Sequence, residues 1–86
     1  MTDLPKDWLD RIFDLMSEFF GDRWDDQFKD KYMINLHKML WFNSLYGLSY
    51  DKIKHALKVC RELSKNKNSK PPNHIKFYHY AIKTIN

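Results

Sequence analysis

The second half of the chain carries a series of helix-ending and helix-starting signals that divides it into separate helices. Gly47 follows an apolar segment and can adopt the left-handed backbone conformation that ends a helix. Ser49 stands where its hydroxyl can accept a hydrogen bond from a free amide at the start of the next helix. Leu48 and Ile53 occupy the two positions of a hydrophobic staple. The pattern therefore predicts one helix that ends near Gly47 and another that begins just after Ser49.

A second break lies at Pro71 and Pro72, because two consecutive prolines exclude a helix and favour an extended backbone. Asn73 is then placed to cap a last helix, whose Phe77 points back into the protein. Residues 65–72 are rich in lysine, asparagine and serine, which is typical of a loop. We expect this loop to be mobile.

Apolar residues recur at helical spacing in four segments and predict helices at about 5–20, 30–46, 50–64 and 74–85. Thr2 or Asp3 is expected to cap the first helix, and residues 22–28 are expected to form a short turn or a single helical turn that tucks in Trp24 and Phe28. The second helix is apolar around most of its circumference, which is typical of the central helix of a bundle.

A length of 86 residues with no long linker predicts one domain that spans residues 1–86. The expected fold is all-α, a single compact domain of four main helices. The second and third helices are expected to run antiparallel across the Gly47-Leu48-Ser49 turn.

The only cysteine is Cys60, so no intramolecular disulfide can form and a reducing compartment is expected. Cys60 falls on the apolar side of its helix, where a thiol usually acts as a small buried hydrophobe. The amino-terminal residues are polar and do not read as a signal peptide. The longest apolar-rich stretch, residues 32–48, is interrupted by polar side chains and does not read as a membrane span. We therefore expect a cytoplasmic protein with no membrane association.

Catalytic and cofactor motifs are missing from the sequence. Two glycines cannot build a glycine-rich phosphate-binding loop. The four histidines lack metal-ligand spacing with one another or with Cys60. The carboxylates of the first helix share a solvent face rather than a cleft. We expect a protein that is not an enzyme and that uses no cofactor or metal.

Charge is distributed unevenly along the chain. Residues 1–28 hold eight acids and three bases, a net charge of −5, whereas residues 29–86 hold twelve bases and three acids, a net charge of +9. Such asymmetry can steer different partners to different faces. Four acids share one side of the first helix and form either a solvated face or a docking surface for a basic partner: Asp7, Asp10, Asp14 and Glu18. Four bases share one flank of the third helix and can contact a phosphate backbone as point charges: Lys54, Lys58, Arg61 and Lys65.

The chain also resembles a known class of proteins. The resemblance begins in residues 12–21, which read Ile-Phe-Asp-Leu-Met-Ser-Glu-Phe-Phe-Gly, and includes the extended step from the two prolines to the last helix. Its signature residues are Trp24, Trp41, Leu45, Gly47, Ser49, Pro72 and Phe77. In this pattern the chain resembles phage helicase-loading proteins, namely the lambda-type replication protein P and the helicase loader/inhibitor of Gram-positive phages. The resemblance implies a DNA replication accessory protein that binds a replicative helicase or a replication initiator without hydrolysing ATP.

Two other functions fit the same residues. The basic flank of the third helix, continued by Lys67 and Lys70, fits a sequence-tolerant nucleic-acid-binding domain. The acidic side of the first helix fits a small protein inhibitor of a host enzyme, in which carboxylates imitate phosphate groups.

Overall fold

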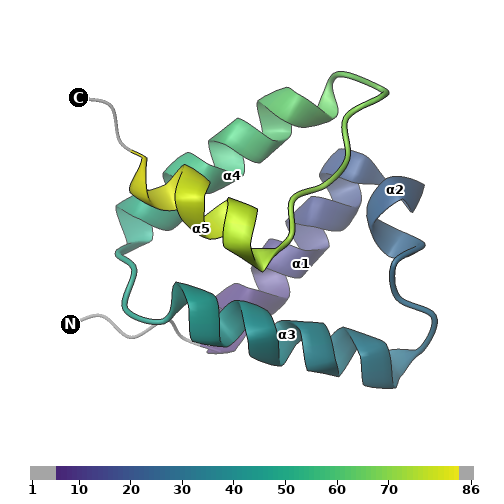
Figure 1. Ribbon diagram of the computed structural model, residues 1–86, viewed down its shortest axis with the longest axis horizontal. Coiled ribbons are helices and arrows are strands. Elements are labelled where there is room, and N and C mark those ends of the chain that lie inside the picture. Colours follow the sequence, from purple (N-terminus) through teal and green to yellow (C-terminus); the bar gives the residue numbers. More distant parts are fainter. Residues whose placement is uncertain (1–5, 84–86) are drawn as a thin grey trace.

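The computed structural model describes residues 6–83, and the regular secondary structure within that range is entirely helical (Figure 1). Its five helices are α1 (Lys6–Phe20), α2 (Asp22–Asp25), α3 (Lys31–Leu45), α4 (Tyr50–Ser64) and α5 (His74–Ile82). The short α2 occupies the place of the predicted turn, and the longer helices begin and end close to the predicted residues. The expected caps Thr2 and Asp3 lie outside the described residues, and α5 ends at Ile82 instead of near residue 85.

Side-chain caps and one glycine set the ends of the later helices as predicted. The Ser49 hydroxyl accepts a hydrogen bond from the Lys52 amide at 3.3 Å. The Asn73 side chain accepts one from the Lys76 amide at 2.9 Å. Gly47 has a φ angle of +90°, a conformation that residues with a β-carbon rarely adopt.

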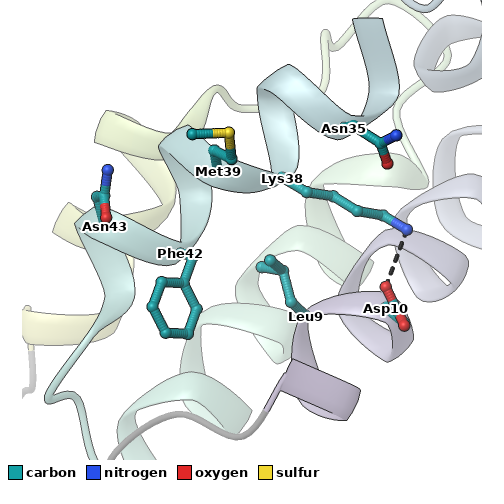
Figure 2. A pocket seen from close by; sticks show the side chains of 7 residues that line it. All are labelled: Leu9, Asp10, Asn35, Lys38, Met39, Phe42 and Asn43. Atoms are coloured by element: carbon teal, nitrogen blue, oxygen red, sulfur yellow. Dashed lines mark hydrogen bonds and ion pairs between the residues drawn. The ribbon is translucent and has the colours of Figure 1, made fainter. Parts of the chain in front are cut away.

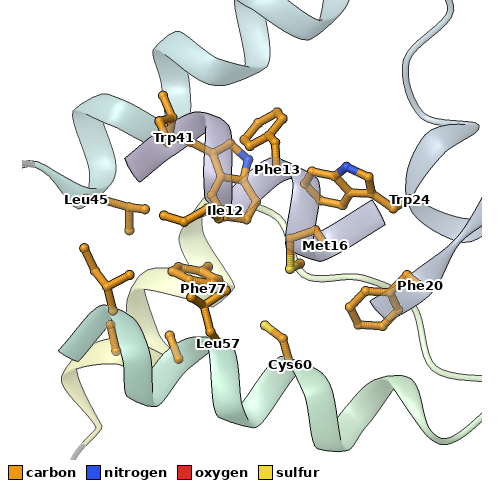
Figure 3. Close-up of a cluster of buried hydrophobic side chains, with 14 residues drawn as sticks. Ile12, Phe13, Met16, Phe20, Trp24, Trp41, Leu45, Leu57, Cys60 and Phe77 are labelled. Carbon is orange, nitrogen blue, oxygen red and sulfur yellow. The ribbon is translucent and has the colours of Figure 1, made fainter. Parts of the chain in front are cut away.

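α1 is the central helix of the fold. It packs against α2, α3 and α4, while α5 closes the other side by packing against α3 and α4. Figure 3 shows Ile12, Met16 and Phe77 at the middle of the buried cluster. Its fourteen buried residues are Leu9, Ile12, Phe13, Met16, Phe20, Trp24, Trp41, Leu45, Ile53, Ala56, Leu57, Cys60, Phe77 and Ala81.

The prediction that the second main helix would be central is wrong. α3 contributes only Trp41 and Leu45 to the buried cluster, whereas α1 contributes five residues. An apolar surface that surrounds a helix does not specify which side packs, and here α1 and α5 cover only one side of α3. Among the remaining apolar side chains of α3, Ile34 and Phe42 are half-buried against the cluster, whereas others are exposed, namely Tyr32, Leu36, Met39 and Leu40.

α3 and α4 do not pack directly against each other. The chain reverses direction at the turn between them, but α5 lies between the two helices in the view of Figure 1, with α1 behind. The radius of gyration of 12.4 Å matches the value of about 12 Å expected for a compact chain of this length. The extents of 34 × 29 × 17 Å describe a flattened molecule in which each longer helix keeps an exposed side.

The segment before Pro71 is contacted by one arginine. The guanidinium of Arg23 in α2 donates hydrogen bonds to the backbone carbonyls of Ser64 at 3.0 Å, Asn66 at 2.9 Å and Ser69 at 2.8 Å. The Ser69 hydroxyl adds a hydrogen bond to the Leu63 carbonyl. This segment therefore has a defined path over the end of α4.

Candidate protein-binding surface

The four predicted acidic residues all lie exposed on α1, but they differ in their surroundings. Asp10 forms an ion pair across to α3, with its carboxylate 2.9 Å from the ammonium of Lys38. Asp7, Asp14 and Glu18 have no ion pair in the described range 6–83. Asp10 and Asp14 line hollows between α1 and α3, whereas Asp7 and Glu18 do not.

The four predicted basic residues lie exposed along α4. Lys54 places its ammonium 5.2 Å from the centre of the Tyr50 ring, a cation–π distance. Lys65 lies 3.4 Å from the Glu62 carboxylate, a solvent-exposed pair that contributes little to stability. Lys58 and Arg61 have no ion pair among residues 6–83. The side of α4 formed by these four residues, the α4 basic stripe, therefore keeps most of its charge available.

The residues that carry the family resemblance are structural. Trp24, Trp41, Leu45, Pro72 and Phe77 are buried, while the glycine and serine of the signature shape the turn before α4. The rings of Trp24 and Trp41 meet edge to face with centroids 5.6 Å apart. The five buried residues help to build the core, whereas Gly47 and Ser49 are exposed.

The surface that sequence reasoning missed is the outward side of α3. Tyr32 is 73% exposed and Met39 is 63% exposed, and Leu36 and Leu40 on the same side of the helix are also exposed. These four residues, the outer face of α3, lie opposite the buried Trp41 at helical spacing. The sequence shows that α3 is apolar around most of its circumference. That pattern predicts burial on every side equally well, so it does not reveal which side is exposed.

A hollow of about 830 Å³ lies between α1 and α3 beside this face. In Figure 2, Lys38 reaches from α3 to Asp10 of α1 at one end, and Phe42 and Leu9 approach each other further along. The lining residues are Leu9, Asp10, Asn35, Lys38, Met39, Phe42 and Asn43.

A second hollow of about 410 Å³ continues on the far side of Lys38. Its lining residues are Phe13, Asp14, Ser17, Trp24, Asp25, Phe28, Ile34 and Lys38. Lys38 lines both hollows and stands between them, and the two hollows together are named the α1–α3 seam. The Lys38 ammonium is held there by Asp10 and lies 5.6 Å from the centre of the Phe13 ring.

Three titratable side chains outside these surfaces lie within or between packed helices, namely Cys60, His74 and Tyr80. Cys60 is fully buried, and its burial raises the pKa of the thiol from 9.0 to about 12, so the thiol stays protonated at neutral pH. Burial and the neighbouring Cys60 also raise the pKa of Tyr80. His74 pairs with the Ser44 hydroxyl, with Nδ1 and Oγ 2.7 Å apart, and joins α5 to α3.

Among residues 6–83, no three histidine, cysteine, aspartate or glutamate side chains are grouped closely enough to hold a metal ion. No helix in this range has the length and apolar character needed to cross a bilayer.

Comparison of the chain with protein-family models, with curated proteins and with solved structures gave no match.

Proposed function

We propose that this chain is a protein-binding module of phage-type DNA replication that binds a replicative helicase or a replication initiator. It acts in the cytoplasm through binding energy alone, without hydrolysing ATP and without a cofactor. The observation that carries the protein-binding part is the exposed outer face of α3. The choice of partner follows from the resemblance to phage helicase-loading proteins.

The outer face of α3 has the chemistry of a protein interface. A tyrosine, a methionine and two leucines stand exposed on three successive turns, and leaving such side chains in water forgoes the stabilisation that their burial provides. Aromatic residues and methionine are enriched where proteins bind one another. The polar side chains of Asn35 and Asn43 flank this face and can form the hydrogen-bonding rim that interfaces carry.

Co-elution with purified replicative helicases and initiators tests the proposal, with the helicase ATPase rate as a second readout. The double variant Tyr32→Glu/Leu36→Glu places two charges on the outer face of α3 and should abolish co-elution and any effect on the ATPase rate. Ile75→Glu is the control, because Ile75 is an exposed apolar residue of α5 outside this face. Failure of the wild-type protein to bind any helicase or initiator would discard the proposed function.

A second candidate function, a sequence-tolerant nucleic-acid-binding domain, is favoured by the α4 basic stripe. Lys54, Lys58 and Arg61 project from one side of α4 without carboxylate partners in the described residues. Cations at this spacing can follow a phosphate backbone, and the resulting affinity falls steeply with salt because bound counterions are released.

A further inference from the structure

We propose that the α1–α3 seam binds one amphipathic helix of the partner protein, with lysine or arginine along one edge of that helix. The inference rests on the proposed function as a protein-binding module and names the chemistry of the partner. It concerns a different surface from the α4 basic stripe.

The floor of the seam offers apolar contacts to such a helix. Leu9 is buried at its base, Phe42 is half-buried above Leu9, and Met39 is exposed at the edge (Figure 2). Methionine at an exposed edge adapts to the shape of a partner side chain. The hollow of about 830 Å³ is therefore an apolar trough that packing inside this chain leaves unfilled.

An α-helix suits this surface better than an extended peptide. A helix satisfies its own backbone hydrogen bonds and needs only side-chain contacts. Residues 6–83 contain no strand, so this part of the chain offers no sheet edge to which an extended peptide could add.

Charge selects a basic partner. Asp10, Asp14 and Asp25 line the seam on the side of α1 and α2, and the only cation among the described lining residues is Lys38, which is already paired with Asp10. The α3 side adds the uncharged amides of Asn35 and Asn43. A helix with lysines facing Asp14 and Asp25 gains attraction, whereas a nucleic acid backbone would be repelled.

The probe is a displayed library of amphipathic helical peptides selected against the purified 86-residue chain. Every peptide has the same leucine-based apolar face, and the flanking positions vary among lysine, glutamine and glutamate. Selection on the wild-type protein should enrich lysine, and the lysine peptide should bind about tenfold more tightly than its glutamate counterpart, the effect of two ion pairs at an interface edge. Met39→Glu should remove most of the binding, whereas Ile75→Glu should leave it unchanged.

Charge reversal provides the decisive comparison. Asp10→Lys/Asp14→Lys makes the seam basic and should reverse the preference from lysine to glutamate. Asp7→Lys/Glu18→Lys makes the same change in net charge on the same helix, at acids that do not line the seam, and should keep the lysine preference. Should the first double variant fail to fold, Asp14→Lys alone, at a side chain without an ion pair in the described residues, should still reduce the preference.

Several results would overturn the inference: no enrichment of lysine, equal effects of the two double variants, binding unaffected by Met39→Glu, or displacement of the peptide by an oligothymidine. The outcome is separable from that of the proposed function. Selection of lysine peptides with no helicase or initiator bound would retain the seam and discard the replication partner. Helicase binding without selection of lysine peptides would retain the replication partner and discard the seam.

Discussion

Gly21 links α1 to α2 through a backbone conformation that only glycine adopts easily. Its φ of 59° and ψ of −129° lie outside the left-handed helical region that asparagine tolerates. Its amide donates a hydrogen bond to the Ser17 carbonyl at 2.7 Å, and its own carbonyl accepts from the Trp24 amide at 2.9 Å. Gly21 therefore ends α1, starts α2 and turns Trp24 into the core.

Gly21→Ala and Gly21→Asn should each lower the free energy of unfolding by about 1 to 3 kcal/mol, the cost of a residue held in a disfavoured backbone conformation. A β-carbon at this position would meet no atom within 4 Å, so the loss comes from the backbone alone. Urea denaturation followed by circular dichroism measures it. Full stability in the asparagine variant would show that the chain can relax into the left-handed helical region here.

The buried thiol of Cys60 predicts a loss of stability in alkaline solution. Below pH 9 the thiol is protonated in both the folded and the unfolded chain, so it adds no pH dependence. Between pH 9 and about 12 only the unfolded chain loses this proton, and the free energy of unfolding falls, by about 1.4 kcal/mol at pH 10. Urea titrations at pH 8 and pH 10 measure the loss, and Cys60→Ala should show a difference between the two pH values that is smaller by this amount. An equal pH dependence in both proteins would contradict the prediction.

At the scale of the elements, Arg23 holds α2 and the segment before Pro71 together. Three backbone carbonyls at the end of α4 and just beyond accept hydrogen bonds from one guanidinium, which also lies 5.1 Å from the centre of the Phe20 ring. Lysine cannot reproduce these contacts, because its ammonium lacks the planar fork of donors.

Arg23→Lys should therefore loosen residues 65–70 and lower the free energy of unfolding by about 1 to 3 kcal/mol, since charged groups form the stronger hydrogen bonds. Faster hydrogen exchange and faster trypsin cleavage after Lys67 should accompany the loss. Arg61→Lys is the control, because the Arg61 side chain is exposed and has no hydrogen bond in the described residues. Unchanged cleavage in Arg23→Lys would show that the segment is held by other contacts.

The difference between Ser49 and Arg23 explains how much of the structure the sequence could predict. Ser49 caps an amide three residues away, so its role is visible locally. Arg23 contacts backbone carbonyls 41 to 46 residues away. Because every residue has such a carbonyl, the sequence does not indicate which ones Arg23 will contact. The Asp10–Lys38 pair joins residues 28 positions apart, so the sequence could not predict it for the same reason. The seam between α1 and α3 could not be predicted either. Helix positions follow from local periodicity, whereas the choice of packed side in α3 depends on where α1 and α5 lie.

At the scale of the whole molecule, the flat shape leaves apolar surface exposed, and the charges are divided between separate helices. A molecule only 17 Å thick along its shortest axis cannot enclose a helix as apolar as α3, so part of its apolar surface remains available to partners. The acids that line the seam lie on α1 and α2, whereas the α4 basic stripe lies on a separate helix. One small protein can therefore present an acidic apolar trough and a basic stripe to two partners at once.

The α4 basic stripe makes a measurable prediction for the nucleic-acid function. Wild-type protein should bind a fluorescent single-stranded oligothymidine, and the logarithm of the affinity should fall with the logarithm of the salt concentration with a slope of about −2, the value for three phosphate contacts on a single strand. Lys54→Glu/Lys58→Glu/Arg61→Glu should abolish binding, because it reverses three adjacent charges.

Lys31→Glu/Lys52→Glu/Lys76→Glu is the matched control, since it makes the same change in net charge at exposed lysines scattered over three helices. It should weaken binding only slightly, because the neighbouring charges of the stripe remain. Fluorescence anisotropy across a salt series measures both variants. An equal loss in the two variants would mean that the oligonucleotide responds to net charge alone, and an affinity independent of salt would exclude contact with the phosphates. In either case α4 would have no role of its own in binding nucleic acid.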